Sequence, residues 1–117
     1  MISEQDIRQL IIHGTGAEGR AALQHFRSSS HIDILLVDQP EKLSEFRTDD
    51  GSSAKIQCIS EDDVRSSSLP DPATCLYLRS PGVQPSNPVF EKIRAAGIAH
   101  TTPTGYWLAT EAPAQTV

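Results

Sequence analysis

Hydrophobic residues along the chain are concentrated in five short runs, most of them unbroken by polar residues. The runs are residues 10–12, 32–37, 56–59, 75–78 and 98–99. Strands that are buried on both faces, as in a parallel sheet, show near-continuous hydrophobic runs of this length, whereas half-buried strands alternate. The pattern therefore predicts five strands of a parallel sheet.

The segments between these runs have helical features. Helices are predicted for residues 17–27, 41–46, 60–65 and 87–96. The last is the clearest, because Asn87 is a good N-cap, Pro88 suits the first helical position and Gly97 can adopt the left-handed conformation that ends a helix. The alternation of strand and helix predicts an α/β fold: a Rossmann-like three-layer domain with a parallel sheet of about five strands and right-handed crossovers.

The remaining segments are polar and are predicted as connections. Residues 47–53 are rich in Asp, Gly and Ser, and residues 66–74 contain three serines and two prolines, so both are predicted as surface loops. The chain of 117 residues has the length of one domain. We expect residues 1–110 to form that domain and the Pro- and Ala-rich residues 111–117 to begin a linker.

The charge balance and the cysteines narrow the class of protein. A net charge of −5 argues against a nucleic-acid or anionic-membrane surface, but not against a small phosphorylated ligand held by backbone amides.

No hydrophobic run approaches the length of about 18 residues that spans a membrane, and the N-terminus lacks the apolar core of a signal peptide. Cys58 and Cys75 both lie in hydrophobic runs and are expected to be buried free thiols rather than a disulfide. These features predict a cytoplasmic location.

A glycine-rich motif of pattern G-x-G-x-x-G lies between the first predicted strand and the first predicted helix. In this context the first glycine permits a tight turn, the second lets a diphosphate approach the backbone, and the third lets helix and strand pack closely. The helix N-terminus adds free N–H groups and a partial positive charge. The motif predicts a phosphate-bearing ligand, although a tight turn without a ligand would use the same glycines. Its residues are Gly14, Thr15, Gly16, Ala17, Glu18 and Gly19.

Two further segments are placed to complete a site. Asp38 ends the second strand, 19 residues beyond Gly19, where dinucleotide enzymes carry a carboxylate that binds a ribose. It could equally bind the N–H edge of a base such as uracil, or only form a turn before Pro40. Ser80 and Gly82 follow the fourth strand, at the sheet edge where open α/β sheets bind ligands, and a simple turn is the alternative there.

Other residue types that often carry chemistry give no further site. No set of Ser, His and Asp can be assembled, so no catalytic residue is predicted in this chain. Tyr106 and Trp107 are expected to pack on a short terminal helix or against another domain. No metal site is predicted, because metal-ligand spacing is missing from the four histidines, which are His13, His25, His31 and His100.

Together these segments resemble the N-terminal domain of the Mur ligases, in particular the glutamate-adding (MurD) type. The resemblance covers nearly the whole chain and depends on three segments: residues 14–23 (GTGAEGRAAL), Asp38, and residues 80–98 with the succession Ser-Pro-Gly-Val, Asn-Pro and Ala-Gly-Ile. The third segment is the most specific, because a generic NAD-binding domain would not be expected to show it.

The resemblance implies a function. In Mur ligases the first domain binds the UDP part of a UDP-N-acetylmuramoyl substrate, the second carries an ATP-binding P-loop and magnesium, and the third helps to bind the amino acid. Glutamate-adding members join glutamate to UDP-N-acetylmuramoyl-L-alanine through an acyl phosphate, in peptidoglycan precursor synthesis in the cytoplasm. By this resemblance the partners of the chain are that substrate and the central and C-terminal domains. ATP and Mg²⁺ belong to the full-length ligase, and the chain alone is expected to be inactive.

The resemblance also assigns roles by position. Ala17 and Glu18 would line the diphosphate through the loop backbone, and Asp38 would accept a hydrogen bond from uracil. Ser80 and Gly82 would flank the nucleotide from the opposite loop. The family's P-loop, of pattern G-T-x-G-K-[ST], and its metal-binding residues have no counterpart here. A P-loop would be expected within a few residues after position 117.

Two positions depart from the family pattern. Familiar members have a small or hydroxyl residue where this chain has Glu18, and a carboxylate about 6 Å from a diphosphate would cost about 3 kcal/mol at an effective dielectric of roughly 20. We therefore expect Glu18 to point to solvent or to pair with Arg20, unless the ligand differs from that of the family. In addition, Gln39 and Pro40 follow Asp38 where the family can offer a hydroxyl and a basic residue.

Two other functions stay open from the residues themselves. The chain could be a stand-alone NAD(P)-binding or other nucleotide-binding Rossmann module without catalysis, in which Asp38 would favour NAD because a carboxylate repels a 2′-phosphate. It could also be a scaffold or interaction domain with the same core and no ligand.

Overall fold

Five strands alternate with helices in the part of the chain that the computed structural model describes, residues 4–44 and 54–107. Within these residues no helix has the length and hydrophobicity needed to cross a membrane. A short helical segment at residues 103–107 follows the last strand. The strands are β1 (Gln9–His13), β2 (Asp33–Asp38), β3 (Lys55–Ser60), β4 (Cys75–Arg79) and β5 (Ala99–Thr101). The helices are η1 (Glu4–Asp6), a 3₁₀ turn, and α1 (Ala17–Phe26), α2 (Pro40–Leu43), α3 (Glu61–Ser66) and α4 (Pro88–Ala95).

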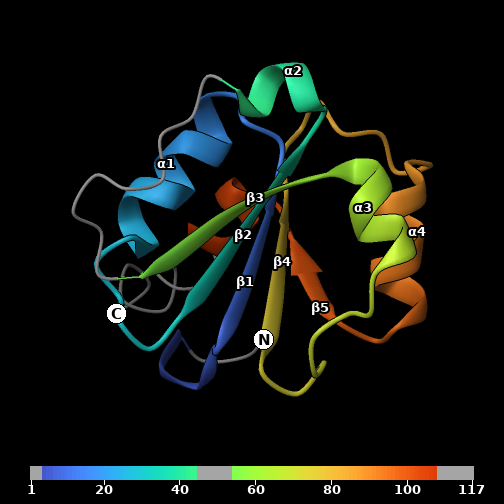
Figure 1. The fold of residues 1–117 in the computed structure, drawn as a ribbon. Coiled ribbons are helices and arrows are strands. Elements are labelled where there is room, and N and C mark those ends of the chain that lie inside the picture. The colour runs from blue at the N-terminus through green and yellow to red at the C-terminus, as the bar shows by residue number, and fades with distance from the viewer. Residues whose placement is uncertain (1–3, 45–53, 108–117) are drawn as a thin grey trace.

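The strands form one parallel sheet in the order β3-β2-β1-β4-β5. β1 is central, and its Leu10 pairs with Ile34 on β2 and with Leu76 on β4. The chain therefore moves outward from β1 to β3 and then crosses back to β4 on the other side of β1. Figure 1 shows α1 on one face of the sheet and α3 and α4 on the other. The predicted fold class, a three-layer Rossmann-like α/β domain with a parallel sheet, is confirmed.

Each face of the sheet has its own hydrophobic core. On one face Phe26 of α1 packs against the strands, and Tyr106 lies beside it with a ring separation of 5.6 Å. On the other face Val64 of α3 and Phe90 of α4 cover the strands, and Phe90 stacks on Tyr77 of β4, also at 5.6 Å. Because the inner strands are covered on both faces, they carry the unbroken hydrophobic runs seen in the sequence.

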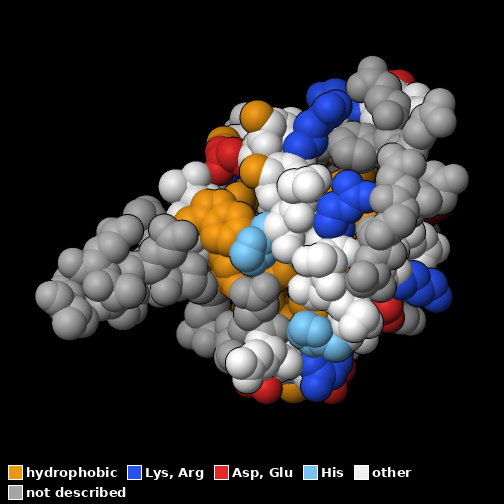
Figure 2. Space-filling view, turned by 90° about the vertical axis from the view of Figure 1, so that its left-hand side faces the viewer, with side chains coloured by type: hydrophobic (Ala, Val, Ile, Leu, Met, Phe, Trp, Pro, Cys, Tyr) orange, Lys and Arg blue, Asp and Glu red, His pale blue; other side chains and the backbone are white. Residues whose placement is uncertain are grey.

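Hydrophobic side chains also reach the surface on the α1 side of the molecule (Figure 2). Trp107 is only partly buried against the core on this side, and its ring lies edge-on to His25 at 4.8 Å. Tyr106 is almost completely buried. The helical segment 103–107 thus holds both aromatic residues against the domain, which is the first of the two arrangements expected for them.

The observed elements differ from the predicted ones mainly at their ends. β1 extends by one residue at each end, to the polar Gln9 and His13, because the backbone ladder continues past the hydrophobic residues. β2 runs from Asp33 to Asp38 rather than over residues 32–37. β5 is Ala99–Thr101 rather than 98–99, and α2 begins at Pro40, one residue before its predicted start. The predicted helix end at residue 46, the loop at 47–53 and the linker at 111–117 lie outside the described residues.

Both cysteines are free thiols, as predicted, but only one is buried. Cys75 lies on an inner strand, and its burial raises its pKa to about 12. Cys58 lies on β3, the edge strand of the described sheet, and is only half-buried because no other strand of residues 4–44 and 54–107 pairs with the outer side of β3. The expectation of burial is therefore wrong for Cys58, although partial burial still raises the pKa of its thiol.

We predict that iodoacetamide alkylates Cys58 of the native chain and spares Cys75 at about pH 8, since the thiolate is the reactive form. Cys75 has no exposed surface and a pKa of about 12, so almost none of it ionises. Mass spectrometry after brief labelling measures the outcome. In the control variant Cys58→Ser, label should enter only after denaturation; rapid labelling of that native variant would contradict the prediction.

Candidate functional site

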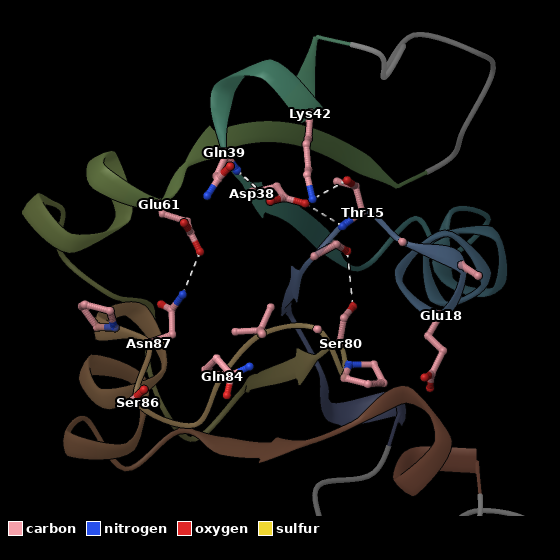
Figure 3. A pocket seen from close by; sticks show the side chains of 17 residues that line it. Thr15, Glu18, Asp38, Gln39, Lys42, Glu61, Ser80, Gln84, Ser86 and Asn87 are labelled. Carbon is pink, nitrogen blue, oxygen red and sulfur yellow. Dashed lines mark hydrogen bonds between the residues drawn. The ribbon is translucent and has the colours of Figure 1, made fainter.

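A cavity of about 640 Å³ opens at the carboxyl edge of the sheet, next to the point between β1 and β4 where the strand order reverses. Ligands of open α/β sheets bind at such a switch point, and the volume is within the usual range for small-molecule sites. Figure 3 shows the side chains that surround it. The predicted site residues that line it are Gly14, Thr15, Gly16, Ala17, Glu18, Asp38, Ser80 and Gly82. The remaining one, Gly19, lies behind the loop and packs against the carbonyl of Gly14.

The three glycines of the loop meet three different steric demands. Gly14 has φ +105°, and a Cβ there would lie 2.7 Å from the Cβ of Ser80. A Cβ on Gly19 would lie 2.0 Å from the carbonyl oxygen of Gly14, so only glycine lets α1 approach the end of β1. A Cβ on Gly16 would meet no atom within 4 Å. The roles expected for the first and third glycines, turn and close packing, are observed, and the backbone at Gly16 is open.

The N-terminus of α1 faces this cavity. Gly16 is its N-cap and provides no side-chain hydrogen bond to the first turn. The amides at the start of a helix have no partner within the helix and carry a partial positive charge. Because Ala17 and Glu18 line the cavity, these amides are available to an anion that enters it. Lys42 of α2 also lines the cavity and adds a cation.

Asp38 holds the loop from the end of β2. Its Oδ2 accepts hydrogen bonds from both the backbone N–H and the hydroxyl of Thr15, each at 2.8 Å. Its Oδ1 accepts from the backbone N–H of Gln39, also at 2.8 Å. On the other side of the loop, Nε of Arg20 donates to the Thr15 carbonyl at 3.0 Å. Asp38 therefore fixes the conformation of the glycine-rich loop, a role that the sequence did not indicate.

Glu18 has a different partner from those expected. Its Oε1 accepts a hydrogen bond from the hydroxyl of Thr104 at 2.6 Å, at an exposed position. In Figure 3 its carboxylate points away from the centre of the cavity. Glu18 therefore contributes its backbone to the cavity wall, while its charge is directed toward the segment after β5.

The loop after β4 forms the opposite wall. Ser80 is buried beneath Gly14, and its backbone N–H donates to the carbonyl of His13 at 3.0 Å. Val83 N–H donates to the Ser80 carbonyl at 3.0 Å, which closes a turn, and Nη1 of Arg79 donates to the Val83 carbonyl at 2.6 Å. A Cβ on Gly82 would meet no atom within 4 Å. The turn thus presents open backbone at Gly82 to the cavity.

A hydrogen-bonded cluster on the α3 and α4 side was not predicted from the sequence. His13, at the end of β1, is completely buried, and its Nε2 lies 2.6 Å from Oε2 of Glu61. Its Nδ1 lies 2.5 Å from the hydroxyl of Tyr77. The side-chain amide of Asn87 donates to the same Oε2 at 3.0 Å. The sequence offered one signal, a histidine at the end of an otherwise hydrophobic strand, but its partners are 48 and 64 residues away.

The protonation of this cluster follows from burial. Burial raises the pKa of Tyr77, and the negative charge of Glu61 raises it further, against the opposing effect of Arg79. Tyr77 therefore keeps its proton and can donate a hydrogen bond to Nδ1 of His13, which leaves Nε2–H to donate to Glu61. Apart from Oε1 of Glu61, each side-chain polar atom of the cluster then has a suitable partner.

The comparisons with known proteins identify no relative: no family model matches the chain, and no match was found among curated proteins or solved structures. In the described part of the chain, no group of three or more His, Cys, Asp or Glu residues could hold a metal ion. The arrangement itself is suited to an anionic group at the loop side of the cavity and to hydrogen-bond donors at its carboxylate side.

We predict that Gly19→Ala destabilises the chain and that Gly16→Ala does not. The added methyl at position 19 would overlap a backbone oxygen that cannot move aside, and such overpacking costs about 1–3 kcal/mol or more. The same methyl at position 16 meets open space, so the change should stay within about 1 kcal/mol. Urea unfolding followed by circular dichroism measures both. Equal stability of the two variants would contradict the packing role of Gly19.

Proposed function

We propose that this chain is the domain that binds the UDP part of UDP-N-acetylmuramoyl-L-alanine in an ATP-dependent ligase that adds glutamate to this substrate. The observation that carries the proposal is the open backbone at Gly16, placed at the N-terminus of α1 beside the switch point of the sheet. The succession of motifs after β4, which resembles the glutamate-adding Mur ligases, supports the choice of UDP over other nucleotides.

The diphosphate would bind at the loop between β1 and α1. The absent side chain at Gly16 lets the phosphate oxygens come close to the backbone, and the amides of Ala17 and Glu18 donate to them. The Thr104 hydroxyl holds the carboxylate of Glu18, which keeps that charge directed away from the diphosphate. Lys42 lines the same cavity from α2 and adds a cation.

The nucleoside would extend from the loop toward the ends of β2 and β4. Ser80 and Gly82 flank it from the loop after β4, and Asp38 borders it at the end of β2. Asp38 already accepts three hydrogen bonds, so its first role is to hold Thr15 in place, and uracil would use its remaining lone-pair capacity. ATP, Mg²⁺, glutamate and the catalytic groups would come from other domains of a longer ligase, which works in the cytoplasm.

The proposal predicts that UDP binds the 117-residue chain weakly. In amide NMR spectra, UDP at millimolar concentration should shift the signals of residues 14–19 and of Gly82. Gly16→Ala, which leaves the fold intact, should weaken binding by about tenfold or more because its methyl occupies the approach of the diphosphate. Shifts with NADH but not with UDP would instead favour the alternative of an NAD-binding module, and no shifts with either would favour a scaffold.

A second prediction concerns the ligase itself. The coding sequence that follows residue 117 should encode a P-loop of pattern G-T-x-G-K-[ST] within about ten codons, because the nucleotide domain of such a ligase is followed directly by its ATP-binding domain. Nucleotide sequencing of the region decides this. A stop codon at that place would contradict the ligase and leave an independent nucleotide-binding protein.

A further inference from the structure

Glu61 lies at the opposite end of the cavity from the glycine loop. It is the first residue of α3, directly after Ser60, whose hydroxyl caps the helix by accepting from Asp63 N–H at 3.2 Å. Figure 3 shows Glu61 and Asn87 on one side of the cavity and Thr15, Ser80 and Glu18 on the other. The side chain of Glu61 is 24% exposed, and it lines the cavity.

The orientation of this carboxylate is set by two donors that converge on one oxygen. Nε2 of His13 and the side-chain amide of Asn87 both bind Oε2, at 2.6 and 3.0 Å. His13 is itself held by the Tyr77 hydroxyl. Asn87 is held because its Oδ1 caps α4, accepting from Val89 N–H at 2.9 Å. Neither donor can turn away without losing a second hydrogen bond.

The other oxygen of Glu61 is left available. Among the described residues, no hydrogen bond reaches Oε1. Asp38, another carboxylate at this edge, uses both of its oxygens within the protein. Glu61 therefore has the larger capacity to accept hydrogen bonds from a molecule in the cavity. A phosphate group would be repelled there, whereas hydroxyl or N–H donors would be bound.

We infer that Oε1 of Glu61 accepts hydrogen bonds from the nucleoside part of the bound nucleotide, either from the ribose hydroxyls or from the N–H of the base, and that His13 is the positioning residue for this contact. The inference rests on the proposed function, because it needs a nucleotide whose diphosphate is bound at the glycine loop. It adds a specificity residue at the end of β3 to a site otherwise built from the ends of β1, β2 and β4. The phosphate and nucleoside parts of the ligand then meet opposite electrostatic surroundings at the two ends of the cavity.

The test compares ligands and variants on the 117-residue chain by calorimetry and NMR. The ligands are UDP, 2′-deoxy-UDP, 3′-deoxy-UDP, N3-methyl-UDP and inorganic pyrophosphate. Glu61→Gln removes the charge while keeping the shape of the side chain. The matched control is Asp62→Asn, which removes the same charge from the same helix turn at a side chain that is 92% exposed. Both variants must first show the native NMR spectrum.

We expect Glu61→Gln to weaken UDP binding by about tenfold, since hydrogen bonds to a charged acceptor are roughly twice as strong as neutral ones. Pyrophosphate binding should stay the same or improve slightly, and Asp62→Asn should change neither. In the unaltered chain, at least one analogue that lacks a donor should bind about tenfold more weakly than UDP. That difference should largely disappear in Glu61→Gln, and the analogue concerned identifies the ribose or the base as the source.

The outcomes separate the inference from the proposed function. If UDP binds and shifts residues 14–19, but Glu61→Gln binds all ligands as the unaltered chain does, the inference is wrong and the proposed function stands. If neither UDP nor pyrophosphate binds, both fail. The comparison of UDP with its three analogues uses the unaltered chain, so it does not depend on whether a variant folds. If all four nucleotides bind the unaltered chain equally well, the inference is overturned by that result alone.

Tyr77→Phe tests the positioning role of His13 separately. It keeps the ring that stacks on Phe90 and removes only the hydroxyl that holds Nδ1 of His13. The ratio of UDP to analogue affinity should fall toward one, while pyrophosphate binding is unchanged. A purely structural hydroxyl would lower stability without moving this ratio, and that result would remove His13 from the proposal.

Discussion

The close approach of α1 to the end of β1 is the contact on which the site depends. No side chain fits at Gly19, because a Cβ there would overlap the carbonyl oxygen of Gly14. None fits at Gly14, because a Cβ there would collide with the side chain of Ser80. These contacts bring the N-terminus of a helix, the end of the central strand and the loop after β4 into one small region. Asp38 then locks the intervening Thr15 by two hydrogen bonds. A helix that started farther away would leave its free amides outside the cavity.

The charges around the cavity are divided between its two ends. The loop end offers backbone amides and a helix dipole, and the carboxylate of Glu18 is held outside by Thr104. The other end carries Glu61, which is supported by a completely buried histidine. Burying polar groups is costly unless each finds a partner, and within the described residues this cluster satisfies every side-chain group except Oε1 of Glu61. The division fits a ligand with an anionic end and a neutral, donor-bearing end.

Some residues could be assigned from the sequence because their roles are local. The glycine loop, the caps of α4 and the strand-helix alternation depend on neighbours a few positions apart, and all were predicted and observed. The role of Asp38 as a loop anchor was missed, because an acidic residue at the end of a strand gives no sign of which donor it will meet. The exposure of Cys58 was missed for a related reason: a hydrophobic run does not reveal whether its strand lies inside the sheet or at its edge.

By itself, the sequence determined the fold class and the position of the glycine-rich loop, since both follow from periodicity and spacing. Only the tertiary structure decided which groups meet at the cavity. His13, Glu61 and Tyr77 lie far apart along the chain. They come together because the parallel register sets β1 beside β4 and because Glu61, the first residue of α3, reaches His13 at the end of β1. Contacts of this kind are set by the packing of whole elements, and no local pattern of residues encodes them.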